Sequence, residues 1–426
     1  DILWIGSDGQ GIYSVYEYNS PFRTAKTNHP VRSFSKTDND IFLVGTKGDG
    51  IKALDRTTGK VNDLFNESNS LISNSVYVMK KNTKGDIFIG TEGSGINILL
   101  NRQSQLTHLI LPVEAPYFKS VYSILFSDND SLLWVGTSDY GLIRIRMYKK
   151  GNLYIADNVK QYLASDKKDA LNNNKIFSII KGRSDDELWL GTRGGGINVF
   201  DIRAESFTRL EDVYPHISLS NNDILSAMKD NERNVWIGTG YGLNHLLLTN
   251  NPPSVIEYID YEAFRNNTIH GILRDKNQNV WVSTNYGLSK IDPAINEITN
   301  YTSKDGLHND EFADGAYYAD NEGTLFFGGV NGLSYFDTDK IQLRDYAPNI
   351  SLSNLRVNNA NQNVYDRIKD NMLKLSYGET YLTFTFAAHD FINNENCEFK
   401  YRVVNFSDEW IENGNITDIT HYDREI

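Results

Sequence analysis

The stretch Leu188-Trp189-Leu190-Gly191-Thr192-Arg193-Gly194-Gly195-Gly196-Ile197-Asn198-Val199-Phe200-Asp201 decides the fold of this chain. An apolar strand leads into a turn rich in glycine, and a second strand with alternating side chains leaves it. Glycine suits such a turn because tight hairpin turns need positive φ angles, which cost other residues free energy. The stretch therefore predicts a β-hairpin.

The same pattern recurs along the whole chain, roughly every 45 residues. A glycine, or in one repeat a serine, leads into the turn of each copy, at Gly6, Gly45, Gly90, Gly136, Gly191, Gly238, Ser283 and Gly328. Each period also holds four short strand signals, for example at 76–79, 86–91, 96–99 and 106–109. A period of this length with four strands is typical of the blades of a β-propeller.

Seven complete sets of strands begin at Val31, so we predict a seven-bladed β-propeller over residues 31–345. The copy in residues 1–30 lacks its own innermost strand, and we interpret it as the tail of a preceding blade or a junction. In the alternative interpretation, residues near Phe22 supply the outer strand of the last blade. An eight-bladed ring is a further alternative.

The period stops after Asp345. Alternating strands at 349–357, 381–386 and 398–403 predict a β-sandwich over residues 346–426. The segment is short for such a domain, so we expect the sandwich to be cut short. The predicted fold class is all-β, with a seven-bladed propeller followed by an incomplete Ig-like sandwich.

The composition restricts the classes of partner. A net charge of −13, spread over scattered Asp and Glu residues, argues against nucleic acid, whose phosphates need a basic surface. The single Cys397 excludes an internal disulfide, and no Cys/His cluster has metal-ligand spacing, so neither a metal nor another cofactor is predicted. No apolar run reaches the length of a membrane span. Because the chain starts without Met inside a repeat, we interpret it as a piece of a longer protein.

Two features of the repeats allow both a structural and a functional interpretation. The second strand of five repeats carries an aromatic residue, which we expect to pack between blades and not to form a sugar-stacking ladder, at Trp134, Trp189, Trp236, Trp281 and Phe326. The longest spacing holds an insertion at 144–174 with Lys and Tyr residues. That insertion either extends an outer hairpin or carries a binding surface.

The repeat Leu-Trp-x-Gly-Thr-x-x-x-Gly-Ile/Leu resembles the two-component-regulator propeller repeat. The later segment is similar to the Tyr-rich Ig-like domain that follows such propellers, at Phe399-Lys400-Tyr401-Arg402-Val403-Val404-Asn405-Phe406-Ser407-Asp408-Glu409-Trp410-Ile411. Together they resemble the periplasmic sensor region of hybrid two-component systems from Bacteroides-type gut bacteria. The resemblance covers essentially the whole chain, and the order of propeller and sandwich is its most telling feature.

Sensors of that family carry two seven-bladed propellers, the sandwich, a membrane helix, a histidine kinase and a response regulator. The resemblance therefore implies a periplasmic receptor for an oligosaccharide released from a glycan, which signals through the geometry of a homodimer. The resemblance also implies that the longer protein contacts the membrane only through its transmembrane helix. Such a signal requires different ligand affinities for two states. Most of the first propeller, the end of the sandwich and all kinase motifs are missing from this chain.

The residues support catalysis poorly. A glycosidase needs two carboxyl groups that face each other across a pocket, about 5 to 9.5 Å apart. The best local pair, Asp310 and Glu311, is adjacent on a strand, where neighbouring side chains point to opposite faces. The matching loops repeat an Asn, which favours turn chemistry, at Asn74, Asn174, Asn222 and Asn267. A propeller enzyme, either a glycosidase or a lyase acting on a glycan or a lactone, is the alternative function.

Recognition has better candidates. In a propeller, the turns between the second and third strands converge on one face with the loops that connect successive blades. Tyrosine faces suit sugar stacking, and an Arg suits a uronate or a sulfate. The candidate ligand-binding residues on these turns are Lys47, Asp49, Tyr140, Arg193, Tyr241, Asn285, Tyr286 and Asn331. No catalytic residue is predicted, and a scaffold or dimerisation module without a small ligand is the third hypothesis.

Overall fold

The computed structural model describes residues 2–9, 11–16, 20–230, 234–249, 253–258, 264, 266–341, 348–370, 372–389, 397, 399–404, 409–414 and 417–422. The chain divides into two compact units, 1–341 and 342–426, and each is described by itself. No helix in the described part of the chain combines the length and the apolar character that crossing a membrane requires.

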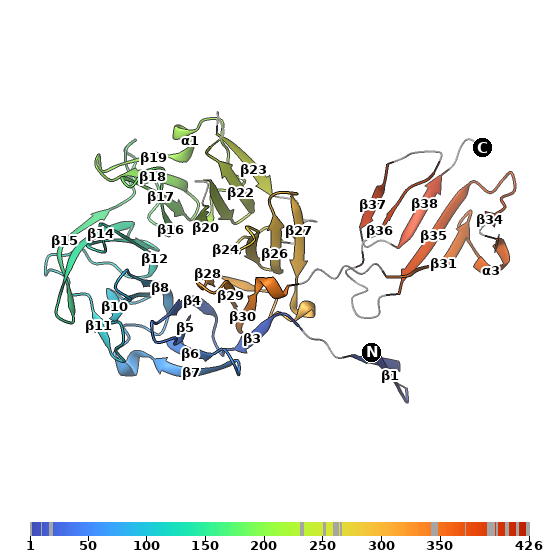
Figure 1. Cartoon of the computed structure of the whole chain (residues 1–426). Helices are drawn as coiled ribbons and strands as arrows, with labels where there is room; N and C mark the ends of the chain where they lie inside the picture. Colours follow the sequence, from blue (N-terminus) through green and yellow to red (C-terminus); the bar gives the residue numbers. More distant parts are fainter. Residues whose placement is uncertain are drawn as a thin grey trace. The chain divides into compact units, whose positions relative to one another are not determined.

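In the part of the first unit that the structure describes, seven four-stranded antiparallel sheets form the blades of a propeller (Figure 1). We call the strands of a blade A to D from the innermost outward. Blades 1 to 4 hold β4 (Val31–Lys36), β5 (Phe42–Thr46), β6 (Ile51–Asp55) and β7 (Lys60–Phe65); β8 (Val76–Lys81), β9 (Ile87–Thr91), β10 (Ile96–Leu99) and β11 (Leu106–His108); β12 (Val121–Ser127), β13 (Leu132–Thr137), β14 (Leu142–Lys150) and β15 (Leu153–Tyr162); and β16 (Ile176–Lys181), β17 (Glu187–Thr192), β18 (Gly196–Asp201) and β19 (Ser206–Arg209).

Blades 5 to 7 complete the wheel. They hold β20 (Ile224–Lys229), β21 (Val235–Thr239), β22 (Gly242–Leu247) and β23 (Ser254–Tyr258); β24 (Gly271–Arg274), β25 (Val280–Thr284), β26 (Gly287–Asp292) and β27 (Glu297–Tyr301); and β28 (Phe312–Ala319), β29 (Thr324–Gly329) and β30 (Gly332–Asp337) with β3 (Arg23–Lys26). Short helical turns lie between strands, at η1 (Glu67–Asn69), α1 (Leu210–Val213), η2 (Ser303–Asp305) and η3 (Thr338–Lys340).

The outer strand of the last blade comes from the N-terminal part of the chain. β3 pairs antiparallel with β30, from Arg23 opposite Tyr335 to Lys26 opposite Gly332. Phe22 is buried and its ring lies 4.8 Å from that of Phe336. The alternative in which residues near Phe22 complete the last blade is therefore the observed one, and a boundary at residue 30 separates β3 from its own sheet. β1 (Ile2–Ser7) and β2 (Gly11–Tyr16) form a separate two-stranded hairpin.

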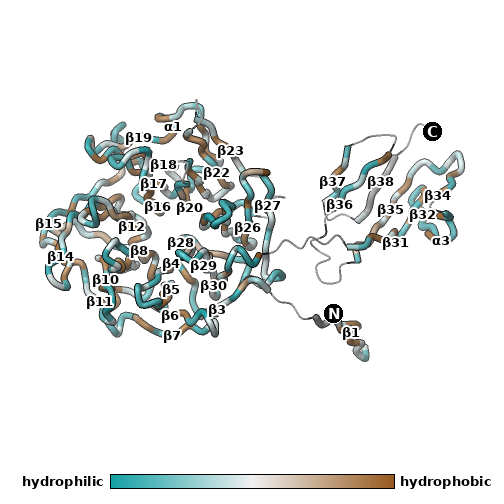
Figure 2. Tube along the Cα trace, in the orientation of Figure 1, coloured by the Kyte–Doolittle hydropathy of each residue, from teal (hydrophilic) through white to brown (hydrophobic). Residues whose placement is uncertain are grey.

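The core of the propeller lies between the blades. Among the described residues, seven hydrophobic clusters each join two neighbouring blades, the cluster with Phe34 and Phe326 joining the last blade to the first. Hydrophobic stretches recur in every blade, with hydrophilic turns between them (Figure 2). The predicted packing of the strand B aromatics is confirmed, because all five are at most 1 % exposed, at Trp134, Trp189, Trp236, Trp281 and Phe326. Burial of such large rings is a major source of stability.

The insertion at 144–174 extends the outer hairpin of blade 3. β14 and β15 continue their pairing as far as Lys150 and Leu153. β15 also bonds to blade 2, where the amide of Ala156 donates to the carbonyl of Ile110 at 2.8 Å. The insertion thus straps two blades together, in line with the structural interpretation of this segment.

The second unit is also built from strands. One sheet holds β32 (Ala360–Gln362), β31 (Ile350–Val357), β35 (Tyr381–Ala388) and β38 (Asp418–Tyr422). One two-stranded sheet is formed by β36 (Phe399–Tyr401) with β37 (Ile411–Gly414). A second is formed by β33 (Ile368–Lys369), which directly follows α3 (Val364–Arg367), with β34 (Met372–Leu373). The all-β fold class is confirmed. Part of the segment quoted for the Ig-like resemblance, residues 405–408, lies outside the described residues.

Candidate functional site

One face of the wheel carries the turns between strands B and C together with the loops that lead from one blade to the next. We call it the B–C face. Five of the seven blades build this turn the same way: the hydroxyl of a buried threonine at the end of strand B donates to the glycine carbonyl that closes the turn, as Thr192 does to Gly196 at 2.9 Å. The Gly-Thr pair of the repeat is thereby explained by turn geometry.

Each of these turns is also bonded to the loop of the next blade. A turn glycine donates its amide to a loop carbonyl, with N···O distances of 2.6–3.1 Å, in the pairs Gly50–Asn74, Gly141–Asn174, Gly196–Asn222, Gly242–Asn267 and Gly287–Asp310. Gly287 must be a glycine, because its φ is +99° and an added Cβ would lie 2.1 Å from a backbone oxygen. The B–C face is therefore a ring of interlocked backbone.

The repeated Asn residues hold these loops, as the predicted turn chemistry requires. The side-chain oxygen of Asn174 accepts from the amide of Ala164 at 2.7 Å. Asn221 accepts from the amide two residues further along, that of Asp223, also at 2.7 Å. Asparagine favours such turns because its side chain bonds to nearby backbone.

At the centre of this face, Asp314 on β28 gathers side chains from three other blades. His270 Nδ1 lies 2.5 Å from one carboxylate oxygen, and Arg193 Nη1 lies 3.3 Å from the other. Arg32 Nη2 lies 3.9 Å from that second oxygen, and Arg193 Nε lies 2.9 Å from a carboxylate oxygen of Asp223. We call Asp314, His270, Arg193, Arg32 and Asp223 the hub.

The charges of the hub set the ionisation of its carboxylate. Burial raises the pKa of Asp314, but the hydrogen bond from His270 and the positive charges of His270, Arg32 and Arg193 outweigh it, so the pKa lies below its usual value. Because a carboxylate accepts only, Nδ1 of His270 carries a proton, and its Nε2 faces the Asn285 side chain at 2.7 Å. The hub therefore holds an ionised Asp314 at pH 7.

Aromatic side chains continue the hub on its other side. The rings of Tyr77 and Tyr122 stack with centroids 4.3 Å apart, and Tyr122 lies equally close to Phe177. The guanidinium of Arg193 lies 4.9 Å from the ring centre of Phe177, and that of Arg32 lies 5.7 Å from that of Tyr77. These contacts add cation–π attraction to the ion pairs.

Two tyrosines stand at the B–C turns of neighbouring blades beside the hub. Tyr241 is 53 % exposed and Tyr286 is 47 % exposed. Their turns are tied to the same loops as the hub, since the amide of Gly240 donates to the carbonyl of Asp223 and Tyr286 follows Asn285 directly. Aromatic rings exposed next to polar groups are the arrangement that sugar recognition uses, because a sugar has an apolar face and a polar edge.

The structure brings four of the eight candidate residues together, namely Arg193 and Asn285 within or against the hub and Tyr241 and Tyr286 beside it. The other four serve separate turns. Lys47 and Asn331 make backbone bonds to residues near β3, Asp49 pairs with Lys52 at 2.6 Å, and Tyr140 packs edge-on against Tyr117.

Four hub residues are not among the residues predicted from the sequence: Arg32, Asp223, His270 and Asp314. Arg32 and Asp314 are the second and third residues of their A strands, and Asp223 and His270 each directly precede one. The sequence could have indicated these residues only by their position at the beginning of strand A, where the blades converge. They share no residue type that would have singled them out.

Two carboxylates of the B–C face, Asp310 and Asp314, are engaged in structural contacts. Asp310 accepts from the amide and hydroxyl of Ser303, at 2.5 and 3.1 Å, and so holds a turn. Asp314 is paired with the guanidinium groups of Arg32 and Arg193 and lies against His270. No group of His, Cys, Asp and Glu suited to a metal ion occurs among the residues that the structure describes.

Comparisons with known proteins bear on this arrangement. Residues 218–241 and 263–286 match the family model of the two-component regulator propeller. The chain carries two-component-regulator propeller repeats. These two segments end at Tyr241 and Tyr286, so the matched unit consists of one interblade loop, strands A and B, and the exposed tyrosine.

Among curated proteins, Histidine kinase P4 of Formosa agariphila is 25 % identical over 386 residues, which make up 76 % of this chain and 27 % of that protein. The extracellular domain of the putative hybrid two component system BT3049 from B. thetaiotaomicron superposes with a TM-score of 0.74 at 22 % identity, covering 98 % of this chain and 55 % of that one. The corresponding domain of BT4673 gives 0.60 at 21 %, covering 99 % and 57 %. This chain thus spans about a quarter of the curated relative and about half of each solved domain.

A further structure shares the propeller. Virginiamycin B lyase from Staphylococcus aureus gives a TM-score of 0.50 at 14 % identity, covering 74 % of this chain and 98 % of the lyase. That likeness concerns the fold only, because a propeller hosts unrelated functions. The resemblance to the sensor regions of hybrid two-component systems is confirmed in its repeats and in its fold.

Proposed function

We propose that this chain is part of the extracytoplasmic sensor region of a hybrid two-component histidine kinase and binds an oligosaccharide on the B–C face. The observation that carries the proposal is the pair of exposed tyrosines, Tyr241 and Tyr286, on backbone-locked turns beside the charged hub. A rigid aromatic platform lowers the entropy cost of binding, and the hub offers charged hydrogen-bond partners to hydroxyl or carboxylate groups.

In this proposal the longer protein lies in the inner membrane, with this region in the periplasm, and acts as a homodimer. Binding would change the relative stability of two dimer geometries, and the kinase would respond to the shift. A ligand shifts such an equilibrium only by its difference in affinity for the two states. The relatives that support the proposal are extracellular domains of two-component systems and a histidine kinase.

A thermal-shift screen of this chain against an oligosaccharide library tests the proposal, with product analysis of each hit. We expect at least one oligosaccharide to raise the melting temperature in a saturable way and to be recovered intact. Recovery of a cleaved product would instead establish the propeller enzyme. If no oligosaccharide raised the melting temperature, a scaffold function would be left.

Variants locate the site of any hit. Tyr286→Ala and Tyr241→Ala should each weaken binding about tenfold, since loss of a stacking ring costs roughly 1.4 kcal/mol. Tyr148→Ala is the matched control, because Tyr148 is 50 % exposed on β14, away from the B–C turns. Equal affinity in all three variants would place the ligand elsewhere and refute the proposed site.

A further inference from the structure

The opposite face of the wheel, which carries the turns between strands A and B and between C and D, has a pocket of its own. We call it the A–B face. The pocket has a volume of about 530 Å³, within the usual range for small-molecule sites. It lies at the seam where β3 completes the last blade, and its lining comes from the start of β3, from blade 7 and from blade 1: Ser20, Pro21, Arg23, Arg56, Thr57, Glu322, Thr324, Tyr335, Phe336, Asp337 and Lys340.

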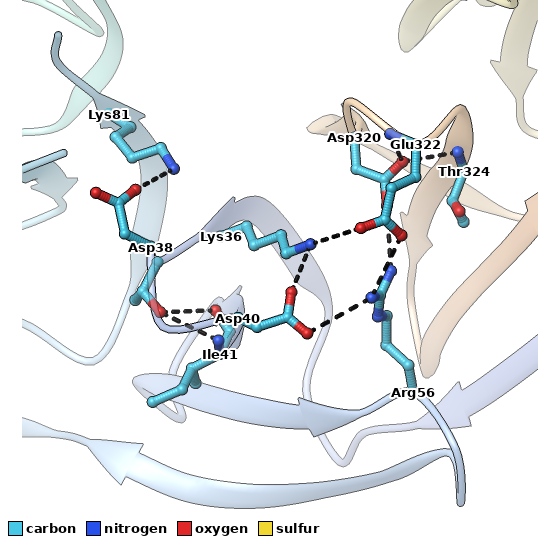
Figure 3. Close-up of polar contacts among 10 residues, drawn as sticks. Lys36, Asp38, Asp40, Ile41, Arg56, Lys81, Asp320, Glu322 and Thr324 are labelled. Atoms are coloured by element: carbon cyan, nitrogen blue, oxygen red, sulfur yellow. Dashed lines mark hydrogen bonds and ion pairs between the residues drawn. The ribbon is translucent and has the colours of Figure 1, made fainter. Parts of the chain in front are cut away.

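Two of the three cations in this lining are already paired. Arg56 Nη1 lies 3.1 Å from the buried carboxylate of Asp320, and its Nη2 lies 3.7 Å from Glu322 (Figure 3). The same network continues through Asp40 and Lys36 of blade 1 (Figure 3). Lys340 lies 3.3 Å from Asp337.

The third cation, Arg23, lacks such a partner. Its guanidinium makes one hydrogen bond among the described residues, a long one of 3.4 Å to the backbone oxygen of Arg56, and no described carboxylate lies within ion-pair distance. A guanidinium presents five donors in a planar fork that matches a carboxylate or a sulfate. In a chain with a net charge of −13, a pocket wall with an unpaired Arg is a local site for an anion.

The remaining lining suits a polar organic ligand more than a bare ion. The hydroxyl-bearing Thr57 and Thr324 lie among the lining residues, and the buried rings of Tyr335 and Phe336 come from β30. We infer that the seam pocket binds a small sugar that carries a carboxylate or a sulfate, with Arg23 as its main anion contact.

Occupancy of this pocket would act on ring closure. The ligand would touch Arg23 on β3, Arg56 on blade 1 and Thr324 on blade 7 at once, and these segments are far apart in the sequence. A ligand that binds only the closed ring stabilises it by mass action. Binding should therefore slow amide exchange in Arg23–Lys26, the strand that closes the wheel.

Titration calorimetry of the whole chain tests the inference, with digalacturonate as the carboxylate probe, galactose 6-sulfate as the sulfate probe and galactobiose as the neutral control. We expect one or both anionic probes to bind saturably, at least tenfold more tightly than galactobiose. Whichever anion binds better identifies the natural anionic group. The absence of saturable binding by both probes would overturn the inference.

The Arg23→Gln variant assigns the contact. It should weaken the binding of the anionic probe at least tenfold and abolish the slower exchange of β3, while Arg23→Lys, which keeps the charge without the fork, should lie between. Because Arg23 is exposed, folding should be unaffected, which a thermal melt of each variant checks. Tyr286→Ala should leave this binding unchanged, so a failure here is separate from a failure at the B–C face. Unchanged affinity in Arg23→Gln would overturn the assignment.

Discussion

The two faces of the propeller are made from turns of the same repeats, yet they are held by different bonds. On the B–C face, backbone amides of turn glycines bond to loop carbonyls of the next blade. On the A–B face at the seam, side-chain ion pairs join blade 1 to blade 7 through Arg56, Asp320 and Lys36 (Figure 3). Because backbone bonds hold the loops of the B–C face, side chains such as Tyr286 stay available to a ligand. At the seam, side chains form the contacts between blades, so most of the charged side chains there are already paired.

The hub is the exception on the B–C face, because its side chains hold the wheel together across the centre. Asp314→Ala would leave Arg32, Arg193 and His270 without their shared carboxylate. Loss of one partner of a buried ion pair costs about 3–5 kcal/mol, so we expect the largest loss of stability here. Urea unfolding measures it. Asp223→Ala, which removes a more exposed carboxylate, should cost about 1 kcal/mol or less. Equal effects would contradict a central role for Asp314.

At the seam, Arg56→Ala would remove the cation that pairs with buried Asp320. The Asp320 carboxylate keeps its bonds to the amides of Glu322 and Thr324, so we expect a loss of about 2 kcal/mol in urea unfolding. Amide exchange of β3 should also become faster. Lys36→Ala is the control, and because its partners are exposed it should cost less than about 1 kcal/mol. A larger effect of Lys36→Ala would show that Arg56 does not dominate the seam.

Buried His245 and partly buried His308 make stability depend on pH. Burial lowers the pKa of His245 and of His308 to about 4, below the ordinary value of 6.5. Below about pH 6.5 the unfolded chain binds protons that the folded chain does not. The free energy of unfolding should therefore be level above pH 6.5 and fall toward pH 4, with a slope of up to about 1.4 kcal/mol per pH unit for each histidine.

Single substitutions separate the two histidines. His308 lies in a loop of the B–C face and bonds to the Ser334 hydroxyl at 2.9 Å, whereas His245 stacks on Trp236 within blade 5. His308→Gln and His245→Gln should each flatten the slope between pH 6.5 and 4.5 in urea unfolding at several pH values. An unchanged slope in either variant would show that its histidine titrates normally.

The smallest effect on stability is expected at the exposed tyrosines. Tyr286→Ala should change the free energy of unfolding by no more than about 0.5 kcal/mol, because its ring is half exposed and its turn is held by backbone bonds. Chemical denaturation checks this. A loss above about 1 kcal/mol would mean that Tyr286 supports the turn, and its availability for a ligand would be in doubt.

The wheel could be predicted from the sequence because each blade is a local pattern. The turn glycines recur along the chain and the strand B aromatics recur in five repeats, and both have local or nearest-neighbour causes. The pairing of β3 with the last blade could be predicted only as one of two alternatives. Its four residues carry a weak pattern with Ala25 as the one buried side chain, and its partner β30 lies about three hundred residues away.

The candidate site was predicted in part for the same reason. Tyr241, Tyr286 and Arg193 stand in turns whose position the repeat defines. Asp314 and Arg32 meet only after the ring has closed, and the residue at their position differs from blade to blade. A charged hub assembled from non-repeated residues leaves no periodic trace in the sequence.

Hydrogen–deuterium exchange of the whole chain with and without a neutral oligosaccharide hit, which the seam pocket is not expected to bind, tests the central claim most directly. The account predicts slower exchange in the B–C turns around Tyr241 and Tyr286 and unchanged exchange in the A–B turns that contain Asp40 and Glu322. Slower exchange confined to the A–B face, or equal exchange throughout with the ligand bound, would contradict recognition on the B–C face.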